Sequence, residues 1–166
     1  MARTYLALGS NLGNRIEYLR QAVCSIPGQV RCSRVYETEP IQAPEGSGPF
    51  LNAVVGFDYA ADKRALLDLV HELELQAKRE RNQINGPRTL DVDVIYVEGM
   101  FSIDPLMTVP HPRCAERAFV IAPLFELDPE LAGQLNRKMA EEIGLALNQQ
   151  LSCPYPGVWI YSESIC

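Results

Sequence analysis

Hydrophobic residues in the first part of the chain follow two different periodicities. Short apolar runs predict four strands, over residues 3–8, 29–38, 50–59 and 91–97. Apolar residues at helical spacing predict two helices, over residues 15–25 and from a cap at Ala61–Asp62 to about residue 76. In the second strand we expect Val30, Cys32 and Val35 to face inward. The predicted order of elements is therefore β-α-β-β-α-β.

The chain beyond residue 97 shows shorter patterns. A tight turn at residues 98–100 predicts a short partner strand, and a proline-rich turn follows at residues 109–112. Helices are expected around residues 116–125 and over residues 137–148, whereas residues 154–157 give only a weak signal. We expect a single domain over residues 1–166 with an α+β fold. Its core is predicted to be a ferredoxin-like βαββαβ unit, an antiparallel sheet with helices packed on it, followed by extra C-terminal helices.

The composition restricts the class of ligand. With 166 residues, 47% of them hydrophobic, the chain is long enough for one sizeable core. The net charge of −6 argues against nucleic acid and acidic membranes as partners. The longest apolar runs fall short of the ~20 residues that a membrane span needs. We therefore expect a monomer that binds small molecules, with any anionic ligand held by a local basic cluster.

The cysteines show no metal-binding or redox pattern. They are scattered without CxxC spacing, at Cys24, Cys32, Cys114, Cys153 and Cys166. Their odd number and the lack of a signal peptide predict buried or free thiols in the reducing cytoplasm.

Two carboxylates stand at i and i+2 in the fourth predicted strand, directly after an arginine-bearing turn. Alternation places Asp91 and Asp93 on one face, roughly 7 Å apart at ~3.3 Å per residue, with Val92 on the other. One interpretation is the solvated face of an edge strand. The other is a Mg²⁺ site, because like charges in a buried strand need a cation and hard oxygen ligands suit Mg²⁺.

Basic residues gather near these carboxylates. Lys78, Arg79, Arg81 and Arg88 form a local cluster in an acidic chain. On the second predicted helix, polar residues share about one third of the circumference and lead into this cluster, namely His71, Glu74, Lys78 and Arg81. For the helix alone, a solvated face with ordinary i,i+4 pairs is the simpler interpretation. This helix face and the basic cluster converge on the edge of the strand that carries Asp91 and Asp93. That convergence favours phosphate binding, since arginine makes bidentate, permanently charged contacts.

Aromatic and amide residues indicate a second kind of contact. Asn52 lies between apolar neighbours in a predicted strand, just after Phe50, so its buried amide needs partners. An amide suits the edge of a flat heterocycle and an aromatic ring suits its face, although a structural hydrogen bond explains Asn52 equally well. His111 is fixed between prolines and precedes Arg117 and Phe119. A lone loop histidine is more often structural, and Phe119 fits a core position equally well.

Taken in order, these segments resemble the 6-hydroxymethyl-7,8-dihydropterin pyrophosphokinase family of folate biosynthesis. The run Gly86-Pro87-Arg88-Thr89-Leu90-Asp91-Val92-Asp93 is highly specific to it. Less specific matches support the resemblance, at residues 7–13, 36–40, 50–53, 109–112, 117–119 and 123–124. The resemblance covers residues 5 to about 130.

The resemblance implies transfer of pyrophosphate from ATP to the hydroxymethyl oxygen of the pterin. It implies that Asp91 and Asp93 hold two Mg²⁺ ions and that the catalytic arginines are Arg79, Arg81 and Arg88. The rest of the implied nucleotide site consists of His71, Glu74, Thr108, His111 and Arg117. The implied pterin site consists of Thr38, Pro40, Phe50, Asn52 and Phe119. The loops at residues 39–49 and 78–88 would be lids that exclude water.

Three positions depart from the family pattern. Lys78 replaces a common glycine, Asn85 a common tryptophan and Gln42 a usual glycine. They leave open a second reading, a catalytically silent paralogue that binds pterin or nucleotide. A third reading, an RNA-binding ferredoxin-like module, is disfavoured by the acidic balance and the lack of an RNP-type motif.

Overall fold

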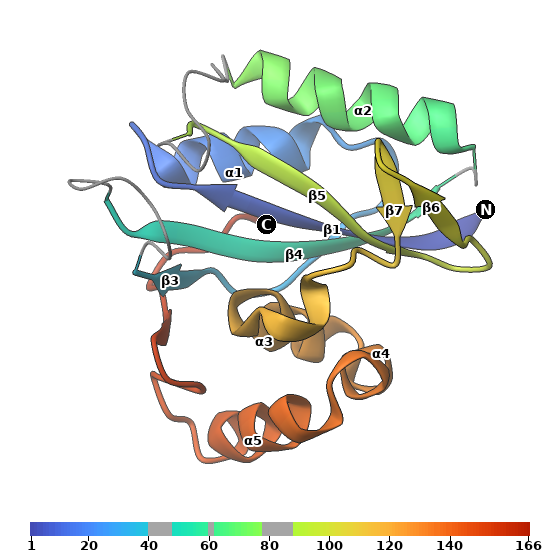
Figure 1. Cartoon of the computed structure of the whole chain (residues 1–166). Coiled ribbons are helices and arrows are strands. Elements are labelled where there is room, and N and C mark those ends of the chain that lie inside the picture. The colour runs from blue at the N-terminus through green and yellow to red at the C-terminus, as the bar shows by residue number, and fades with distance from the viewer. Residues whose placement is uncertain (40–47, 60–61, 78–87) are drawn as a thin grey trace.

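The computed structural model describes residues 1–39, 48–59, 62–77 and 88–166, and its centre is a twisted sheet (Figure 1). The strands follow the order β5-β1-β4-β3-β8, with a further short strand, β2, paired with β4. Every strand pairing in this sheet is antiparallel. The strand bounds are β1 Ala2–Ser10, β2 Arg31–Cys32, β3 Tyr36–Thr38, β4 Phe50–Tyr59, β5 Asp91–Val97 and β8 Val158–Ile160.

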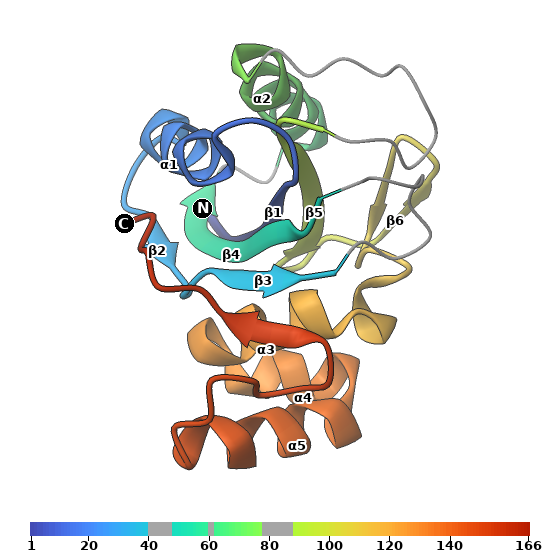
Figure 2. The same ribbon diagram turned by 90° about the vertical axis from the view of Figure 1, so that its left-hand side faces the viewer.

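Helices cover both faces of this sheet (Figures 1 and 2). On one face lie α1 (Arg15–Ser25) and α2 (Lys63–Gln76). On the other lie α3 (Ala118–Leu127), α4 (Pro129–Leu135) and α5 (Arg137–Asn148), after a 3-10 turn at Cys114–Glu116. The central strand β4 is therefore buried along most of its length, because neither of its faces meets water.

Alternation along the strands divides the apolar residues between two cores. Leu6 and Val55 belong to the core under α1 and α2, whereas their neighbours Tyr5 and Val54 belong to the core under α3 to α5. Successive strand residues point to opposite faces, so adjacent apolar residues serve different cores. This pattern explains why β1 and β4 read as continuous apolar runs in the sequence.

Side-chain caps fix where three of the helices begin. Asp62 accepts a hydrogen bond of 2.8 Å from the backbone N–H of Arg64 at the start of α2. Asp128 and Asn136 do the same for α4 and α5, at 2.9 and 3.1 Å. Each cap satisfies a backbone donor that has no partner within the helix.

Much of the expected secondary structure is confirmed. The α+β class and the antiparallel sheet agree with the prediction. The helices at Arg15–Ser25 and Arg137–Asn148 and the strand at Phe50–Tyr59 have the predicted bounds. The helix expected from residue 116 begins at Ala118. The short helix α4 and the strand β8 were not predicted, because neither has enough periodic residues to give a signal.

The single strand predicted over residues 29–38 is wrong. Two short strands, β2 and β3, replace it, and both pair with β4. Between them the Ser33 hydroxyl accepts a hydrogen bond of 3.0 Å from the N–H of Val54. A side chain thus occupies the place of a backbone acceptor and interrupts the ladder. Val35 is buried as expected, whereas Val30 and Cys32 are only partly buried.

The expected partner of the fourth predicted strand is also wrong. The strand after the turn at residues 98–99 is β6 (Ser102–Asp104), and it pairs with β7 (Met107–Val109) in a separate two-stranded sheet. Lys63 at the start of α2 holds this hairpin, because its ammonium group contacts Asp104 at 2.5 Å and Ser102 at 3.2 Å.

Two cysteines that were expected to be thiols are joined. Cys32 and Cys166 form a disulfide across 134 residues of sequence, with their Cα atoms 6.0 Å apart. The C-terminal segment brings them together, because it returns to the sheet and buries Ile165 in the core under α1 and α2. Cys24, Cys114 and Cys153 are free. In the ranges that the structure describes, no helix has both the length and the apolar character needed to cross a bilayer.

Candidate active site

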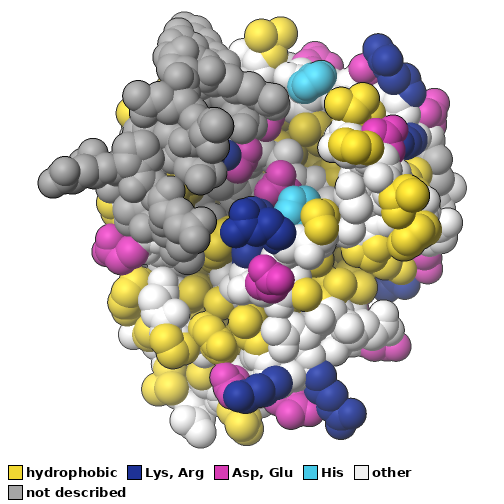
Figure 3. All heavy atoms as spheres, in the orientation of Figure 1, with side chains coloured by type: hydrophobic (Ala, Val, Ile, Leu, Met, Phe, Trp, Pro, Cys, Tyr) yellow, Lys and Arg dark blue, Asp and Glu magenta, His cyan; other side chains and the backbone are white. Residues whose placement is uncertain are grey.

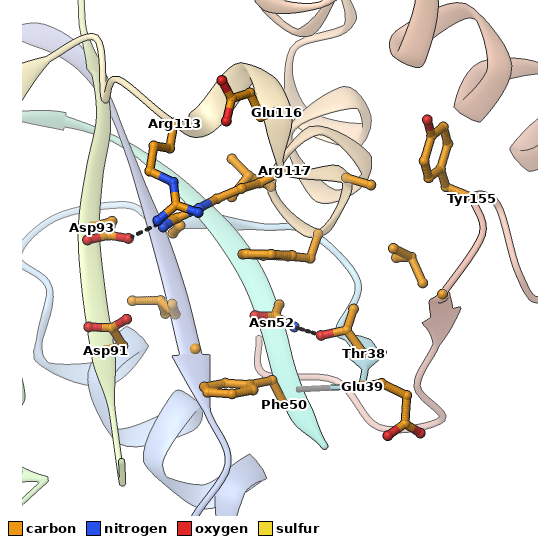
Figure 4. Close-up of a pocket in the computed structure, with 18 of the residues that line it drawn as sticks. Thr38, Glu39, Phe50, Asn52, Asp91, Asp93, Arg113, Glu116, Arg117 and Tyr155 are labelled. Carbon is orange, nitrogen blue, oxygen red and sulfur yellow. Dashed lines mark hydrogen bonds and ion pairs between the residues drawn. The ribbon is translucent and has the colours of Figure 1, made fainter. Parts of the chain in front are cut away.

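Strand β5 presents two carboxylates to one cavity of about 550 Å³. Asp91 and Asp93 are partly exposed and project from β5 beside each other, whereas Val92 and Val94 between and after them are buried (Figure 4). The predicted alternation is therefore confirmed. Figure 3 shows basic, acidic and histidine side chains gathered near the middle of this face of the molecule.

Each carboxylate is paired with an arginine. Nη1 of Arg88 lies 2.7 Å from Oδ2 of Asp91, and Nη1 of Arg117 lies 3.2 Å from Oδ2 of Asp93. These four side chains are between 21% and 36% exposed, so the pairs lie at the boundary between protein and solvent. Their charges are partly screened by water, and the side chains can exchange partners when a charged ligand arrives.

His111 faces the same carboxylate as Arg117. Its Nε2 lies 3.8 Å from Oδ2 of Asp93, while its Nδ1 accepts a hydrogen bond of 3.2 Å from the N–H of Arg113. Burial lowers the pKa of His111, Arg117 and Arg113 lower it further, and Asp93 opposes them. In the neutral ring the proton then sits on Nε2, the nitrogen that faces Asp93.

Asn11 fixes the backbone at Arg88. Its Oδ1 accepts a hydrogen bond of 2.8 Å from the N–H of Arg88, and its own N–H donates to the Arg88 carbonyl at 3.1 Å. Its side-chain nitrogen lies 3.4 Å from the carbonyl oxygen of Gly48. Asn11 is buried, so these bonds are shielded from water. The turn after β1 thereby sets the position from which Arg88 reaches Asp91.

A buried amide and a hydroxyl lie farther along the cavity. The Asn52 side-chain N–H donates to Oγ1 of Thr38 at 2.9 Å (Figure 4). A Cβ added at Gly9 would lie 3.5 Å from Asn52 Oδ1, 3.8 Å from Phe50 Cδ1 and 3.9 Å from Asp91 Cβ. Gly9 therefore lies where the acidic and amide parts of the cavity meet, and its lack of a side chain keeps that junction open.

Aromatic rings provide apolar surface in the same cavity. Phe50 and Phe119 both line it and both are partly exposed. The guanidinium carbon of Arg117 lies 5.6 Å from the centre of the Phe119 ring, a cation–π contact that helps to hold both side chains. The cavity thus combines ionic groups, a hydrogen-bonding amide and ring faces.

Most of the site residues predicted from the sequence, among those that the structure describes, lie in this cavity. Its lining includes Thr38, Phe50, Asn52, Arg88, Asp91, Asp93, Arg117 and Phe119. His71 is exposed on α2, and the Thr108 hydroxyl donates to the Asp104 carbonyl at 3.1 Å. Four candidates are not among the residues that line the cavity, namely His71, Glu74, Thr108 and His111. Pro40, Arg79 and Arg81 lie outside the described residues, as does most of each expected lid, and their roles stay predictions.

Several lining residues were not predicted from the sequence. They include Gly9, Arg113, Glu116, Met139 and the C-terminal segment at residues 155–158. The family match at residues 7–13 was a visible signal for Gly9 and for the buried Asn11. The C-terminal residues gave no comparable signal, because a short proline-rich stretch has no periodicity to interpret.

The carboxylates provide a small, hard donor set. Within the parts of the chain that the structure describes, no three His, Cys, Asp or Glu side chains cluster in a way that could hold a metal ion. Two carboxylates alone suit Mg²⁺, which is commonly held by one or two carboxylates together with substrate phosphates. Asp91 and Asp93 therefore fit Mg²⁺ that arrives with a phosphate ligand.

Comparison with known proteins gives consistent matches. Residues 5–129 match the family described as 7,8-dihydro-6-hydroxymethylpterin-pyrophosphokinase. The chain is 34% identical to the 2-amino-4-hydroxy-6-hydroxymethyldihydropteridine pyrophosphokinase of Bacillus subtilis, over 96% of this chain and 97% of that protein. Proteins of the same name from Methylorubrum extorquens and Pseudomonas aeruginosa are 38% and 31% identical, over 79% and 94% of this chain and 85% and 94% of their own lengths.

Proposed function

This chain belongs to the 7,8-dihydro-6-hydroxymethylpterin-pyrophosphokinase family, and we propose that it transfers pyrophosphate from ATP to 6-hydroxymethyl-7,8-dihydropterin. The products are the pterin diphosphate, an intermediate of folate biosynthesis, and AMP. One observation carries this proposal. A single cavity joins two arginine-paired carboxylates to a buried amide and two aromatic rings.

The carboxylate end is suited to the nucleotide. Asp91 and Asp93 would hold two Mg²⁺ ions, with the substrate phosphates as the remaining ligands. Magnesium bound there would neutralise phosphate charge and make the pyrophosphoryl group easier to attack. Arg88 and Arg117 already lie at 2.7 and 3.2 Å from these carboxylates, so phosphates bound through the metal would come close to both guanidinium groups. With Arg79 and Arg81, they would stabilise the charge that shifts during transfer.

The amide end is suited to the pterin. Asn52 and Thr38 can hydrogen-bond to the edge of the heterocycle, and Phe50 and Phe119 offer faces for stacking. Recognition by buried polar groups is selective, because a ligand without matching donors and acceptors leaves them unpaired. The hydroxymethyl group would then point toward Asp91 and Asp93.

The reaction needs few functional groups from the protein. The pterin hydroxymethyl oxygen attacks the β-phosphorus of ATP, and the bond from that phosphorus to the oxygen bridging the α- and β-phosphates breaks. The bonding electrons leave with AMP, and the alcohol proton is released. The contribution of this chain is to align the two oxygens with the phosphorus and to stabilise the charge.

The sheet supports a ferredoxin-like core. The order β5-β1-β4-β3, with α1 and α2 on one face, is what a βαββαβ chain produces when its two halves interlock. We infer one domain over residues 1–166, because both apolar cores pack on the same sheet. That the protein acts as a monomer stays a prediction from the sequence.

The decisive experiment measures AMP. Purified protein with ATP, Mg²⁺ and the hydroxymethyl-dihydropterin should form AMP and pterin diphosphate in equal amounts. ATP hydrolysis without pterin is the control for a contaminating phosphatase. Binding of both substrates without AMP would instead identify a catalytically silent pterin- or nucleotide-binding paralogue, the reading that Lys78, Asn85 and Gln42 suggest.

A further inference from the structure

The cavity extends past the amide to the C-terminal segment. Tyr155, Pro156, Gly157 and Val158 line it, together with Met139 of α5. All of them lie beyond residue 129, where the family match ends. Figure 4 shows Tyr155 at the opposite end of the view from Asp91 and Asp93, with Asn52 and Thr38 between them.

The strand order explains this arrangement. Strand β5, with the carboxylates, is one edge of the sheet, and β8 is the other. Asn52 and Thr38 stand on the strands between them, so the cavity runs across the ends of the strands from one edge to the other. If the hydroxymethyl group of the pterin points to β5, the opposite end of its ring system points to β8.

Strand β8 pairs with β3, the strand whose Thr38 binds the side-chain amide of Asn52. Val158 lies opposite Thr38, whose hydroxyl accepts the hydrogen bond from Asn52. The N–H of Val158 also donates to the carbonyl of Tyr155 at 2.9 Å. Gly157 closes this turn with a φ of +77°, a conformation that favours glycine. Backbone bonds therefore place Tyr155 at the cavity.

The rest of the C-terminal segment is anchored on the sheet and on α1. The N–H of Tyr161 donates to the Val35 carbonyl at 2.8 Å, and Arg20 binds Glu163 and the Ser164 carbonyl, each at 3.0 Å. The disulfide at Cys166 fixes the end of the chain. Held by these bonds and by the pairing of Val158 with Thr38, the segment at residues 155–158 has the fixed backbone that a binding wall needs.

We propose that Tyr155 is a further substrate-binding residue, whose ring closes the acceptor end of the cavity around the pterin. This inference rests on the proposed function. Tyr155 packs on the same apolar cluster as Phe119 and Met139, so its ring extends the apolar surface on which a flat heterocycle can lie. The side chain is only partly buried, which leaves surface for a ligand.

The test compares Tyr155→Ala with Tyr155→Phe and Tyr155→Leu. Pterin binding is measured without ATP, by the change in pterin fluorescence, and steady-state assays give KM for each substrate. We expect Tyr155→Ala to raise Kd and KM for the pterin about tenfold, with KM for ATP unchanged. Tyr155→Phe should have Kd and KM values for the pterin close to those of the original chain. Tyr155→Leu should have intermediate values, because it keeps apolar bulk without the ring.

The matched control is Trp159→Ala. Trp159 belongs to the same segment and is aromatic, but it is 42% exposed and does not line the cavity. It should bind pterin as the original chain does. Unchanged pterin affinity in Tyr155→Ala, or an equal loss for pterin and ATP, would overturn the inference. A chain that binds pterin through Tyr155 but forms no AMP would contradict the proposed function alone.

Discussion

Glu74 on α2 accepts a hydrogen bond of 3.2 Å from the backbone N–H of Val92, the residue between the two carboxylates of β5. Glu74 is 5% exposed, although glutamate is rarely buried without a partner. Strand β5 lies at the edge of the sheet, where outward-facing backbone donors need partners from elsewhere. A helix side chain thereby holds the segment that carries Asp91 and Asp93.

Removing that acceptor should disturb both stability and the site. We expect Glu74→Ala to lower the free energy of unfolding by about 1–3 kcal/mol, because a buried N–H loses its partner. AMP formation should fall as well, since β5 is less firmly placed. Glu74→Gln keeps an oxygen acceptor and should retain more of both. Urea unfolding and AMP assays on the two variants test this, and equal behaviour of alanine and glutamine would contradict it.

The carboxylates should be needed for turnover and much less for folding. We predict that Asp91→Ala and Asp93→Ala each lower the turnover number by roughly 100-fold or more. The metal would lose a protein ligand, and the phosphates that it binds would be held less firmly. Stability should change by only about 1 kcal/mol, since both ion pairs are partly exposed. Asp58→Ala, on the exposed part of β4, is the control. Original rates in both site variants would remove the proposed metal role.

Metal removal should have a matching effect. Chelation by EDTA should abolish AMP formation, and added Mg²⁺ should restore it, because in the proposed mechanism Asp91 and Asp93 hold the triphosphate through the metal. Pterin fluorescence without ATP should respond little to EDTA, since Asn52 and Thr38 make no use of the metal. Full activity in EDTA would contradict the mechanism.

Asn11 should act through Arg88. Asn11→Ala removes the 2.8 Å bond to the Arg88 N–H, so we expect about a tenfold loss of kcat/KM for ATP, equivalent to one hydrogen bond. Asn14→Ala is a matched control in the same turn, because Asn14 is exposed and its side chain makes no capping bond. An equal loss in both variants would point to a general effect on the turn.

The Thr38 hydroxyl should matter for the acceptor. Thr38→Val keeps the shape but leaves the buried Asn52 amide without its 2.9 Å partner. We expect KM for the pterin to rise about tenfold and KM for ATP to stay unchanged. Thr38→Ser keeps the hydroxyl and should rescue most of the loss. A serine variant as impaired as the valine variant would show that the methyl group, and not the hydroxyl, is what matters.

The disulfide should stabilise the fold. It closes a loop spanning 134 positions, so Cys166→Ser should lower the free energy of unfolding by about 2–4 kcal/mol under oxidising conditions. Cys24→Ser is the control, since Cys24 is exposed and free. Urea denaturation with and without dithiothreitol measures both effects. Insensitivity of the original chain to dithiothreitol would show that the bond is not formed in solution.

The sequence by itself determined the features that depend on neighbouring residues. Helical spacing defined α1 and α5, and strand alternation placed Asp91 and Asp93 on one face. The GPRTLDVD run indicated the family, which the comparisons confirmed. These features are local, because a helix face or a strand face is set by residues only a few positions apart.

Only the tertiary structure decided which distant residues meet. The bond from Asn11 to Arg88, the support of β5 by Glu74 and the place of Tyr155 at the cavity all join separate elements. The splitting of the second predicted strand at Ser33 has the same origin, since its partner lies on β4. Strand order and helix placement bring such pairs together, and both follow from burying two cores on one sheet, which no local periodicity encodes.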